Sequence, residues 1–365
     1  MSTRKNDAQW MEKQQRWQIK VQKDGQRRTF YSSNPSRRGK VEAERKADHW
    51  LEVGSCDENI RFGSLWNDFL AEVQLTTSLS NYKSHELYGR KWLLPRLTKK
   101  RVAAITLQDW QNCLLDAYVS GLAKKTIKNI RGSITAFYRY AFKRGVPIVR
   151  PEFLDIPKDA PVKPKKILQP QDIKTLFSCD TVRVHNQEVE AFYIHAWRFL
   201  TVTALRRGEL CGLCSSDLDN NILCVSRSIN RFGEVTGGKN QNAERSFVLS
   251  QIALRILDDQ SAMLKRLHII SPYLFPAEDG TRLNPNTLYD RWDTYRKQYG
   301  IETTLHGLRH TFISVVKSDM PGELVKLIAG HSTSMDTFGI YGHELDGDAA
   351  RAAGMVDDVF RRLIK

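Results

Sequence analysis

The sequence predicts a mainly α-helical protein with small β elements, organised as a sheet-plus-helix unit, a four-helix domain and a larger, mostly helical domain with short strands. Three observations support this prediction. Apolar residues recur at three- and four-residue steps over long stretches, strand-like alternation is confined to short ones, and a proline- and lysine-rich segment separates two parts of different charge. With 365 residues, the chain is long enough for two or three domains, each with its own core.

The first unit is expected to cover residues 1–58. Residues 17–31 alternate polar and apolar side chains around Asp24 and Gly25, which predicts a hairpin with a tight turn. A helix is expected from Val41, where alanines and apolar side chains recur at helical spacing. A small sheet with one helix follows from this pattern.

Four helices are expected in the second domain, residues 59–156. We place a cap of the first helix at Ser64, the end of the second at Pro95, a cap of the third at Thr106, and the longest helix at residues 124–143. Together these helices supply enough apolar positions for a bundle with its own core.

Positive charge is concentrated in the first 150 residues. The chain has a formal net charge of +15, and residues 61–150 hold 16 Lys and Arg against 5 Asp and Glu, whereas residues 151–365 hold 27 of each sign. An excess of positive charge that is so segregated favours nucleic acid as a partner, bound with strong salt dependence. For Arg27 and Arg28, a solvated strand face is an equally good explanation. The residues expected to contact DNA are Arg27, Arg28, Lys83, Arg90, Lys91, Lys99, Lys100, Arg101, Lys124, Lys125, Lys128 and Arg131.

Composition and motifs exclude several other classes. No apolar run approaches the roughly 18 residues that span a bilayer, and the N-terminus lacks an apolar signal core, so an intracellular protein without membrane contact is expected. The lone pair Cys211 and Cys214 predicts buried thiols, because a single C-x-x-C is weak support for zinc. No phosphate-binding glycine loop or carboxylate cluster is present, and neither a cofactor nor a metal is expected.

Residues 157–166 are expected to form an extended linker between the basic domains and the rest of the chain. The segment from Ile156 to Lys166 has three prolines and four lysines and no apolar periodicity. Its lysines either keep the linker solvated or follow a DNA backbone, and the sequence leaves both explanations open.

The last domain is expected to cover residues 167–365. A helix should begin at Pro170, a largely apolar helix at Val189 and further helices from Gln251 onward, with two short strands between, at residues 221–228 and 244–250.

Polar side chains stand in several apolar stretches of this domain. Arg206, His306, Arg309, His331 and Tyr341 are the five positions concerned. A buried cation needs an anion or a hydrogen-bonding role, so each requires an explanation. Arg206 could pair with Glu209, and the histidine and tyrosine could be ordinary half-buried residues, so the set is more informative than any member.

The stretches TALRRGELCGL, LHGLRHTF and LIAGHSTSMDTFGIYGH resemble, in this order, the Arg box, the His-x-x-Arg box and the Gly-His to Tyr box of tyrosine recombinases, the phage integrase family. The gaps of 22 residues from Arg309 to His331 and of 10 to Tyr341 are of the size that this family shows. Ala204 stands where the family more often has glycine, which we interpret as a packing change. Lys239 is the only lysine in the hairpin where the family carries its catalytic lysine.

The resemblance implies a site-specific DNA recombinase, an integrase that cleaves and rejoins strands through a covalent 3′-phosphotyrosyl intermediate and integrates and excises a mobile element. It implies a core-site-binding helical domain and, more weakly, an arm-site-binding domain like that of phage or conjugative-transposon integrases. The implied roles are Tyr341 as nucleophile, Arg206 and Arg309 as phosphate clamps, His306 as proton acceptor, Lys239 as general acid and His331 as hydrogen-bond donor to the phosphate.

The expected partners are double-stranded DNA attachment sites, further copies of the chain in a tetramer on DNA, and an accessory DNA-bending or excision factor. The expected location is the bacterial cytoplasm, at the nucleoid. Members of this family commonly exchange a C-terminal segment, so the resemblance implies that the C-terminal helix, with Val356, Val359 and Phe360 on its apolar side, docks on a neighbouring subunit, although it could fold onto its own domain. A type IB topoisomerase and a catalytically silent DNA-binding regulator are the alternatives to the integrase.

Overall fold

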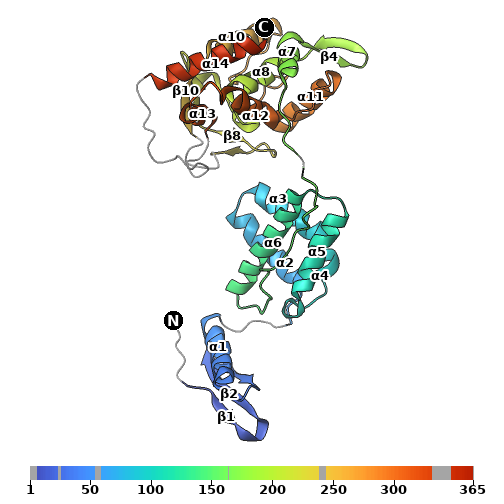
Figure 1. Cartoon of the computed structure of the whole chain (residues 1–365), viewed down its shortest axis with the longest axis vertical. Coiled ribbons are helices and arrows are strands. Elements are labelled where there is room, and N and C mark those ends of the chain that lie inside the picture. The colour runs from blue at the N-terminus through green and yellow to red at the C-terminus, as the bar shows by residue number, and fades with distance from the viewer. Residues whose placement is uncertain are drawn as a thin grey trace. The chain divides into compact units, whose positions relative to one another are not determined.

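The computed structural model describes residues 6–23, 26–53, 59–162, 164–237, 244–330 and 347–364. The chain divides into two compact units, residues 1–163 and 164–365 (Figure 1). Their described residues form three separate hydrophobic cores, two in the first unit and one in the second. The predicted fold class, mainly helical with small sheets, is confirmed.

The N-terminal region is a three-stranded antiparallel sheet with one helix. β1 (Gln9–Met11), β2 (Arg16–Lys23) and β3 (Gln26–Ser32) pair in this order, and α1 (Arg37–Val53) packs on the sheet. The predicted hairpin is present, whereas β1 was not predicted. The helix begins before Val41, because Ser36 accepts a hydrogen bond from the amide of Arg38 and so caps an earlier turn.

The register of β2 and β3 assigns the predicted DNA-binding arginines to opposite faces of this sheet. Arg28 pairs with the buried Val21, and Arg27 pairs with Gln22. Because side chains alternate between faces, Arg28 lies on the face that α1 covers and Arg27 lies on the open face. Lys20 shares that open face with Arg27.

The helical domain packs around aromatic side chains. Its elements are α2 (Phe62–Thr76), α3 (Leu79–Tyr88), the π-helical turn η2 (Gly89–Leu93), α4 (Leu94–Leu97), η3 (Val102–Ala104), α5 (Leu107–Val119) and α6 (Lys124–Lys143). The rings of Phe62 and Phe137 meet edge to face with centroids 4.9 Å apart, and Trp66 and Trp110 complete the cluster.

Three of the predicted helix boundaries in this domain are tested by local geometry. Thr106 caps α5 as predicted, since its side chain accepts from the amide of Asp109. Ser64 is not a cap, because α2 already begins at Phe62. Pro95 does not end the second helix. The helix widens into the π turn, where the Leu94 amide donates to the carbonyl of Gly89. Pro95 then stands in the first turn of α4, where a backbone amide has no partner within the helix, so proline is tolerated.

The linker is held at both of its ends. On the first unit, the amide of Lys124 donates to the Pro161 carbonyl (2.8 Å), and Ala160 is buried in the helical core. On the second, the Thr303 hydroxyl donates to the Lys166 carbonyl (2.6 Å), and the amide of Leu168 donates to Thr311 (2.9 Å). Part of the ten-residue linker that the composition indicates is therefore bound to one unit or the other.

The second unit is built around a central helix. The structure describes α7 (Pro170–Ser178), β4 (Thr181–Val184), β5 (Gln187–Glu190), α8 (Ile194–Thr203), α9 (Arg207–Leu210), η4 (Ser215–Asp217), β6 (Leu218–Asp219), β7 (Ile222–Val225), β8 (Ser228–Ile229), β9 (Val235–Thr236), β10 (Arg245–Val248), α10 (Gln251–Arg266), α11 (Pro285–Gln298), α12 (Leu305–Val316), α13 (Gly322–Ala329) and α14 (Asp348–Ile364). All ten residues of α8 are buried, and this helix packs against α10 and α12. One sheet has the order β10-β7-β6, and β8 pairs with β9.

The helix predicted to begin at Val189 begins later, at Ile194. The preceding residues form the β4–β5 hairpin, in which His185 and Asn186 both have positive φ at the turn. Two consecutive positive φ angles suit the twist of a tight hairpin, so the backbone leaves the helical region there. Val189 itself belongs to β5, which ends at Glu190, and the helix begins only after this strand.

In the single chain the C-terminal helix α14 packs on its own unit, the second of the two arrangements that the sequence allowed, and docking on a neighbouring subunit stays a prediction. Val356, Val359 and Phe360 are buried in the core of the second unit. Asp357 accepts hydrogen bonds from the amides of Gln251 and Ile252 (2.8 Å each), which ties α14 to the beginning of α10. None of the helices in the described ranges is long and apolar enough to cross a bilayer.

Candidate active site

The structure describes three of the six predicted catalytic residues and brings those three together. Arg206 stands at the start of α9, and His306 and Arg309 lie one turn apart on α12. The three side chains influence one another electrostatically, although about 100 residues of sequence separate the two segments. Lys239, His331 and Tyr341 lie outside the described residues.

Arg206 pairs with Glu209 and still faces solvent. Its guanidinium donates to Glu209 Oε1 (2.6 Å) and to the carbonyl of Gly330 (3.3 Å), and its amide donates to Glu209 Oε2 (2.9 Å). The internal ion pair that the sequence allowed is therefore present. Because 40% of the side chain stays exposed, a ligand can reach the guanidinium while the carboxylate orients it.

Arg309 is a buried cation beside the first. Its residue is 3% exposed, and its guanidinium donates to the carbonyl of Ala204 (2.5 Å). Burial, followed by the charge of Arg206, lowers the pKa of Arg309 to about 10. A bound anion would stabilise the charged guanidinium of Arg309, because it would offset both the lost hydration and the repulsion from Arg206.

The departure from the family pattern at Ala204 is a matter of backbone conformation, which corrects our interpretation of it as a packing change. Ala204 ends α8 in the left-handed region, with φ +55°. Glycine adopts this conformation without strain, whereas alanine is disfavoured there by about 1 kcal/mol. The conformation directs the Ala204 carbonyl to Arg309.

His306 is neutral at physiological pH. Burial lowers its pKa to about 4, with further contributions from His310 and Arg309. The His310 ring stands edge-on to His306, with centroids 4.7 Å apart. A neutral imidazole can accept a proton, which is the property that the predicted role requires.

Sequence reasoning missed a further charged residue of the site, Arg245. Glu209 is buried, and both of its oxygens also accept from Arg245 (2.9 and 3.3 Å). Burial alone would raise the pKa of Glu209, but Arg245 and Arg206 hold it below its usual value. Alternation in the strand could have indicated Arg245, because it shares a face with the buried Phe247.

The cysteine pair lies beside this region. Cys211 is buried, and burial raises the pKa of its thiol to about 12. Cys214 is half-buried and accepts a hydrogen bond from Arg227 (3.0 Å). Across the described ranges, no three His, Cys, Asp or Glu side chains come together in a way that could hold a metal ion.

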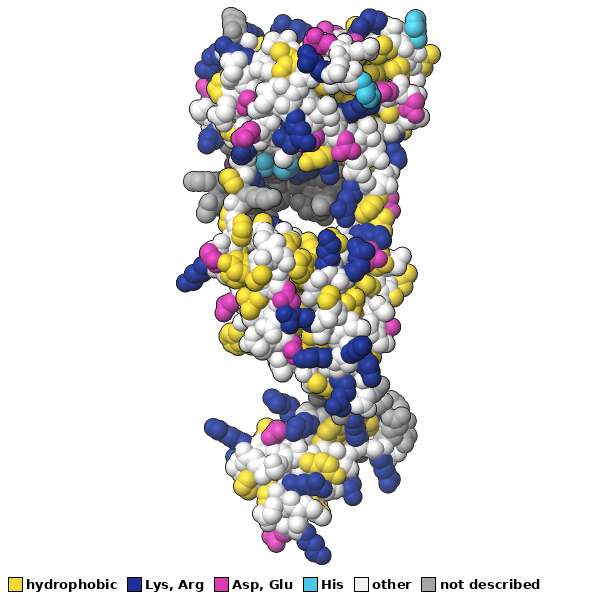
Figure 2. Space-filling view, turned by 90° about the vertical axis from the view of Figure 1, so that its right-hand side faces the viewer, with side chains coloured by type: hydrophobic (Ala, Val, Ile, Leu, Met, Phe, Trp, Pro, Cys, Tyr) yellow, Lys and Arg dark blue, Asp and Glu magenta, His cyan; other side chains and the backbone are white. Residues whose placement is uncertain are grey.

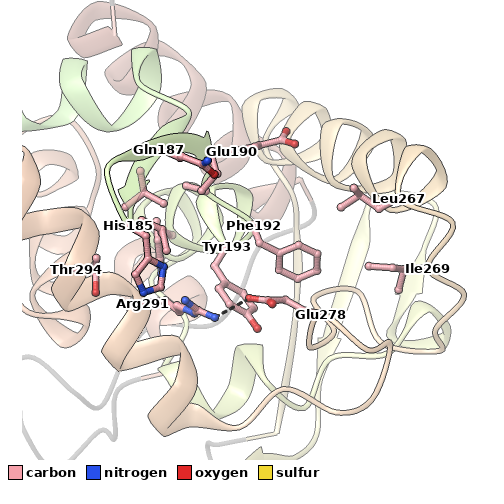
Figure 3. A pocket seen from close by; sticks show the side chains of 15 residues that line it. His185, Gln187, Glu190, Phe192, Tyr193, Leu267, Ile269, Glu278, Arg291 and Thr294 are labelled. Carbon is pink, nitrogen blue, oxygen red and sulfur yellow. Dashed lines mark hydrogen bonds and ion pairs between the residues drawn. The ribbon is translucent and has the colours of Figure 1, made fainter.

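A cavity of about 610 Å³ lies in another part of the second unit (Figure 3). The β4–β5 hairpin and α11 contribute to its wall, and an ion pair between Arg291 and Glu278 (3.1 Å) lies on it. Tyr193 also lines it, with a pKa that burial raises to about 12. Neither Arg206, His306 nor Arg309 lines this cavity, so it is separate from the cationic cluster.

The predicted DNA-binding residues of the helical domain differ in what they contact. Figure 2 shows Lys and Arg side chains spread over the visible face of this part of the chain, with acidic and hydrophobic ones among them. One group donates hydrogen bonds to other residues of the protein. Lys83, Lys100 and Arg101 donate to the side chains of Glu86, Asp109 and Asn59. Lys124 and Arg131 donate to the backbone carbonyls of Lys158 and Leu154. A second group is exposed and makes no side-chain hydrogen bond or ion pair with the described residues: Arg90, Lys91, Lys99, Lys125 and Lys128. The exposed group is better placed to meet phosphates.

Known proteins resemble both the second unit alone and nearly the whole chain. The model of the phage integrase family matches residues 166–347. A tyrosine recombinase XerC-like protein of Caldanaerobacter subterraneus is 23% identical and covers 92% of each chain. Tyrosine recombinase XerC of Alcanivorax borkumensis is 25% identical over 66% of this chain and 75% of that protein.

Solved structures have the same fold. The Tn1549 transposon integrase in complex with transposon right end DNA superposes with a TM-score of 0.63 at 23% identity, covering 80% of this chain and 98% of that one. A lambda integrase tetramer bound to a Holliday junction gives a TM-score of 0.61 at 14% identity, covering 93% and 98%.

Proposed function

From the premise that this chain belongs to the phage integrase family of tyrosine recombinases and is a site-specific DNA recombinase, we propose that it integrates and excises a mobile element through Tyr341. The relatives are recombinases, so the topoisomerase and the silent regulator are set aside. The observation that carries the catalytic part of the proposal is the meeting of two arginines, Arg206 and Arg309, with the neutral His306.

Two arginines suit the charge that develops during strand cleavage. A phosphodiester carries one negative charge, and attack on phosphorus adds a second to its non-bridging oxygens. Arg206 and Arg309 would bind these oxygens with paired N–H donors, which the point charge of a lysine cannot do. The buried Glu209 keeps Arg206 in place before DNA arrives.

Proton transfer completes the proposed chemistry. Tyr341 attacks phosphorus, its proton passes to the neutral His306, and the 5′ oxygen leaves with a proton from Lys239. His331 donates a hydrogen bond to the phosphate. The new 3′-phosphotyrosyl bond retains the energy of the broken one, so the strands rejoin without ATP.

The two basic regions would hold the DNA. In the helical domain, exposed residues such as Lys125 and Lys128 on α6 would bind core-site phosphates. In the N-terminal region, the open sheet face with Lys20 and Arg27 would bind arm sites, since a major groove is wide enough to admit a two-stranded β ribbon. This assigns core sites to residues 59–156 and arm sites to residues 1–58.

We infer that four copies of the chain act together on paired attachment sites. The lambda integrase structure is described as a tetramer on a Holliday junction. Exchange of α14 between copies would require this helix to leave its buried position. An accessory DNA-bending or excision factor and action at the nucleoid in the bacterial cytoplasm belong to the same proposal.

Covalent capture tests the proposal. The chain is incubated with nicked duplexes that carry a random central segment, and DNA in adducts that survive detergent is sequenced. We expect the captured DNA to converge on one sequence, joined by its 3′ phosphate to Tyr341. Tyr341→Phe should give no adduct, whereas Tyr273→Phe, in the same unit, should give the normal yield. Absence of adduct with the unmodified chain, or its persistence in Tyr341→Phe, would overturn the proposal.

A further inference from the structure

Arg245 is a third arginine of the catalytic cluster, and the proposed chemistry gives it no task. It is the first residue of β10, and its side chain is 7% exposed. A buried guanidinium is costly unless its donors are satisfied. Among the described residues its donors reach two different segments, and each of those segments belongs to the active site.

The first contact is the carboxylate that orients Arg206. Glu209 Oε1 accepts from the guanidiniums of both Arg206 (2.6 Å) and Arg245 (3.3 Å). Glu209 Oε2 accepts from the Arg206 amide (2.9 Å) and from Arg245 (2.9 Å). One carboxylate thus joins the two arginines, and a shift of Arg245 must alter the position of Glu209 and of the Arg206 side chain.

The second contact is the end of α13. Arg245 Nε donates to the carbonyl of Ile328 (3.0 Å), two residues before Gly330. A Cβ at Gly330 would lie 2.9 Å from Arg245 Nη1, so glycine allows the close approach, and its φ of +63° also suits glycine. The Gly330 carbonyl in turn accepts from Arg206. The residue that follows Gly330 is His331.

We propose that Arg245 is a positioning residue that sets Arg206 through Glu209 and fixes the end of α13 from which His331 follows. The inference rests on the proposed function, in which Arg206 binds the scissile phosphate. Arg245 also begins the strand that follows the segment containing Lys239. One side chain therefore joins the Arg box, the Gly-His box and the base of the lysine-bearing segment.

The geometry requires arginine at this position. The planar guanidinium presents one edge to both oxygens of Glu209 while its Nε serves the Ile328 carbonyl. A lysine ammonium can keep the charge but cannot hold the two partners in this fixed arrangement. Because a buried ion pair adds little net stability, orientation is the better reason for its presence here.

The test compares Arg245→Lys with Arg227→Lys. Arg227 is a matched control, since it also makes a bidentate pair with a carboxylate, Asp217 (2.8 and 3.0 Å), and donates to a carbonyl, that of Gly212. The substrate is the nicked duplex selected by covalent capture, and the readouts are the single-turnover cleavage rate at saturation and the half-saturating DNA concentration.

We expect Arg245→Lys to lower the saturated rate by about 10- to 100-fold, with the half-saturating concentration changed less than about twofold. Arg227→Lys should keep the normal rate even where its thermal stability falls. In a Glu209→Gln background, Arg245→Lys should add little further loss, because its path to Arg206 is already broken. An unchanged rate in Arg245→Lys, or a loss equal to that of Arg227→Lys, would overturn the inference.

Two further variants keep the inference testable. If Arg245→Lys loses its folded circular dichroism spectrum, Glu209→Gln weakens the same bridge while keeping the side-chain shape, and its rate should fall similarly; a normal rate would contradict the inference. Tyr341→Phe separates the two proposals. Adduct formation by Tyr341→Phe would refute the proposed function, whereas its loss, together with a normal rate in Arg245→Lys, would refute this inference alone.

Discussion

Basic residues are exposed on the helical domain, whereas in the second unit some are buried and hydrogen-bonded. On α6 of the helical domain, Lys125 and Lys128 are exposed, and residues 61–150 hold 16 basic side chains against 5 acidic ones. In the second unit the signs are balanced, yet the side chains of Arg309 and Arg245 are buried and bonded to carbonyl or carboxylate oxygens. Net charge therefore identifies the basic helical domain, whereas the catalytic cluster of the second unit is identified only by the placement of single side chains.

The difference has a consequence for mutation. Exposed cations act on DNA through the number of counterions that they release, so one replaces another at little cost. Buried cations act through fixed direction in a region of low dielectric, where a substitution is not compensated. Experiments that replace a cation in each region should therefore give effects of different size and kind.

The largest effect is expected for Arg309→Lys. A lysine cannot hold the Ala204 carbonyl and a phosphate oxygen together, so the cleavage rate on the selected duplex should fall by about 10²-fold or more. Duplex affinity, measured by titration at the same salt, should change little. Equal losses of rate and affinity would remove the distinction between the two regions.

The next effect concerns the contact between the linker and α12. A Cβ at Gly307 would lie 2.1 Å from Thr303 Oγ1 and 2.7 Å from the Lys166 carbonyl, so Gly307→Ala should destabilise the second unit by about 1–3 kcal/mol. Gly354 on α14 has nothing within 4 Å of such a Cβ, and Gly354→Ala should stabilise by about 0.5–1 kcal/mol. Urea unfolding measures both, and equal shifts would refute the close approach.

A smaller effect is expected from exposed lysines. The double substitution Lys125→Gln and Lys128→Gln should reduce the slope of log affinity against log salt by about 2, since each lost phosphate contact removes about 0.9. The cleavage rate at saturating DNA should stay normal. Lys297→Gln, which removes a lysine paired with Asp293 in the balanced unit, serves as control and should leave the slope unchanged.

The smallest effect concerns the pH dependence of stability. His306 has a folded pKa of about 4, below its ordinary value, so between pH 6.5 and 4 the unfolded chain binds the extra proton. Its contribution is present above pH 6.5 and is lost as the pH falls toward 4. Urea unfolding at pH 7 and pH 5 should show a larger loss for the unmodified chain than for His306→Gln. An equal loss would contradict the lowered pKa.

Local patterns predicted what local physics decides. The cap at Thr106 and the limits of α6 depend on a few neighbouring residues, and both are confirmed. The three motifs singled out Arg206, His306 and Arg309, which the structure brings together, while their catalytic roles stay a prediction. The two helix boundaries did not need knowledge of distant contacts.

The failures depend on contacts between distant segments. Arg245 was missed because its partners Glu209 and Ile328 lie 36 and 83 residues away. The docking of the C-terminal helix on a neighbour was expected from the family resemblance and stays a prediction; the sequence did not reveal that, in the single chain, Asp357 binds the start of α10, over 100 residues earlier. Periodicity reports that a face is buried and leaves its partner open.

The central claim is that side chains scattered along the second unit gather around one scissile phosphate. A crystal structure of Tyr341→Phe on the captured duplex tests it most directly, through the distances from the non-bridging oxygens to the guanidiniums of Arg206 and Arg309. We expect both to be about 3 Å, with residue 341 of this chain or of a neighbouring copy facing the phosphorus. A scissile phosphate remote from both guanidiniums in every subunit would contradict the account.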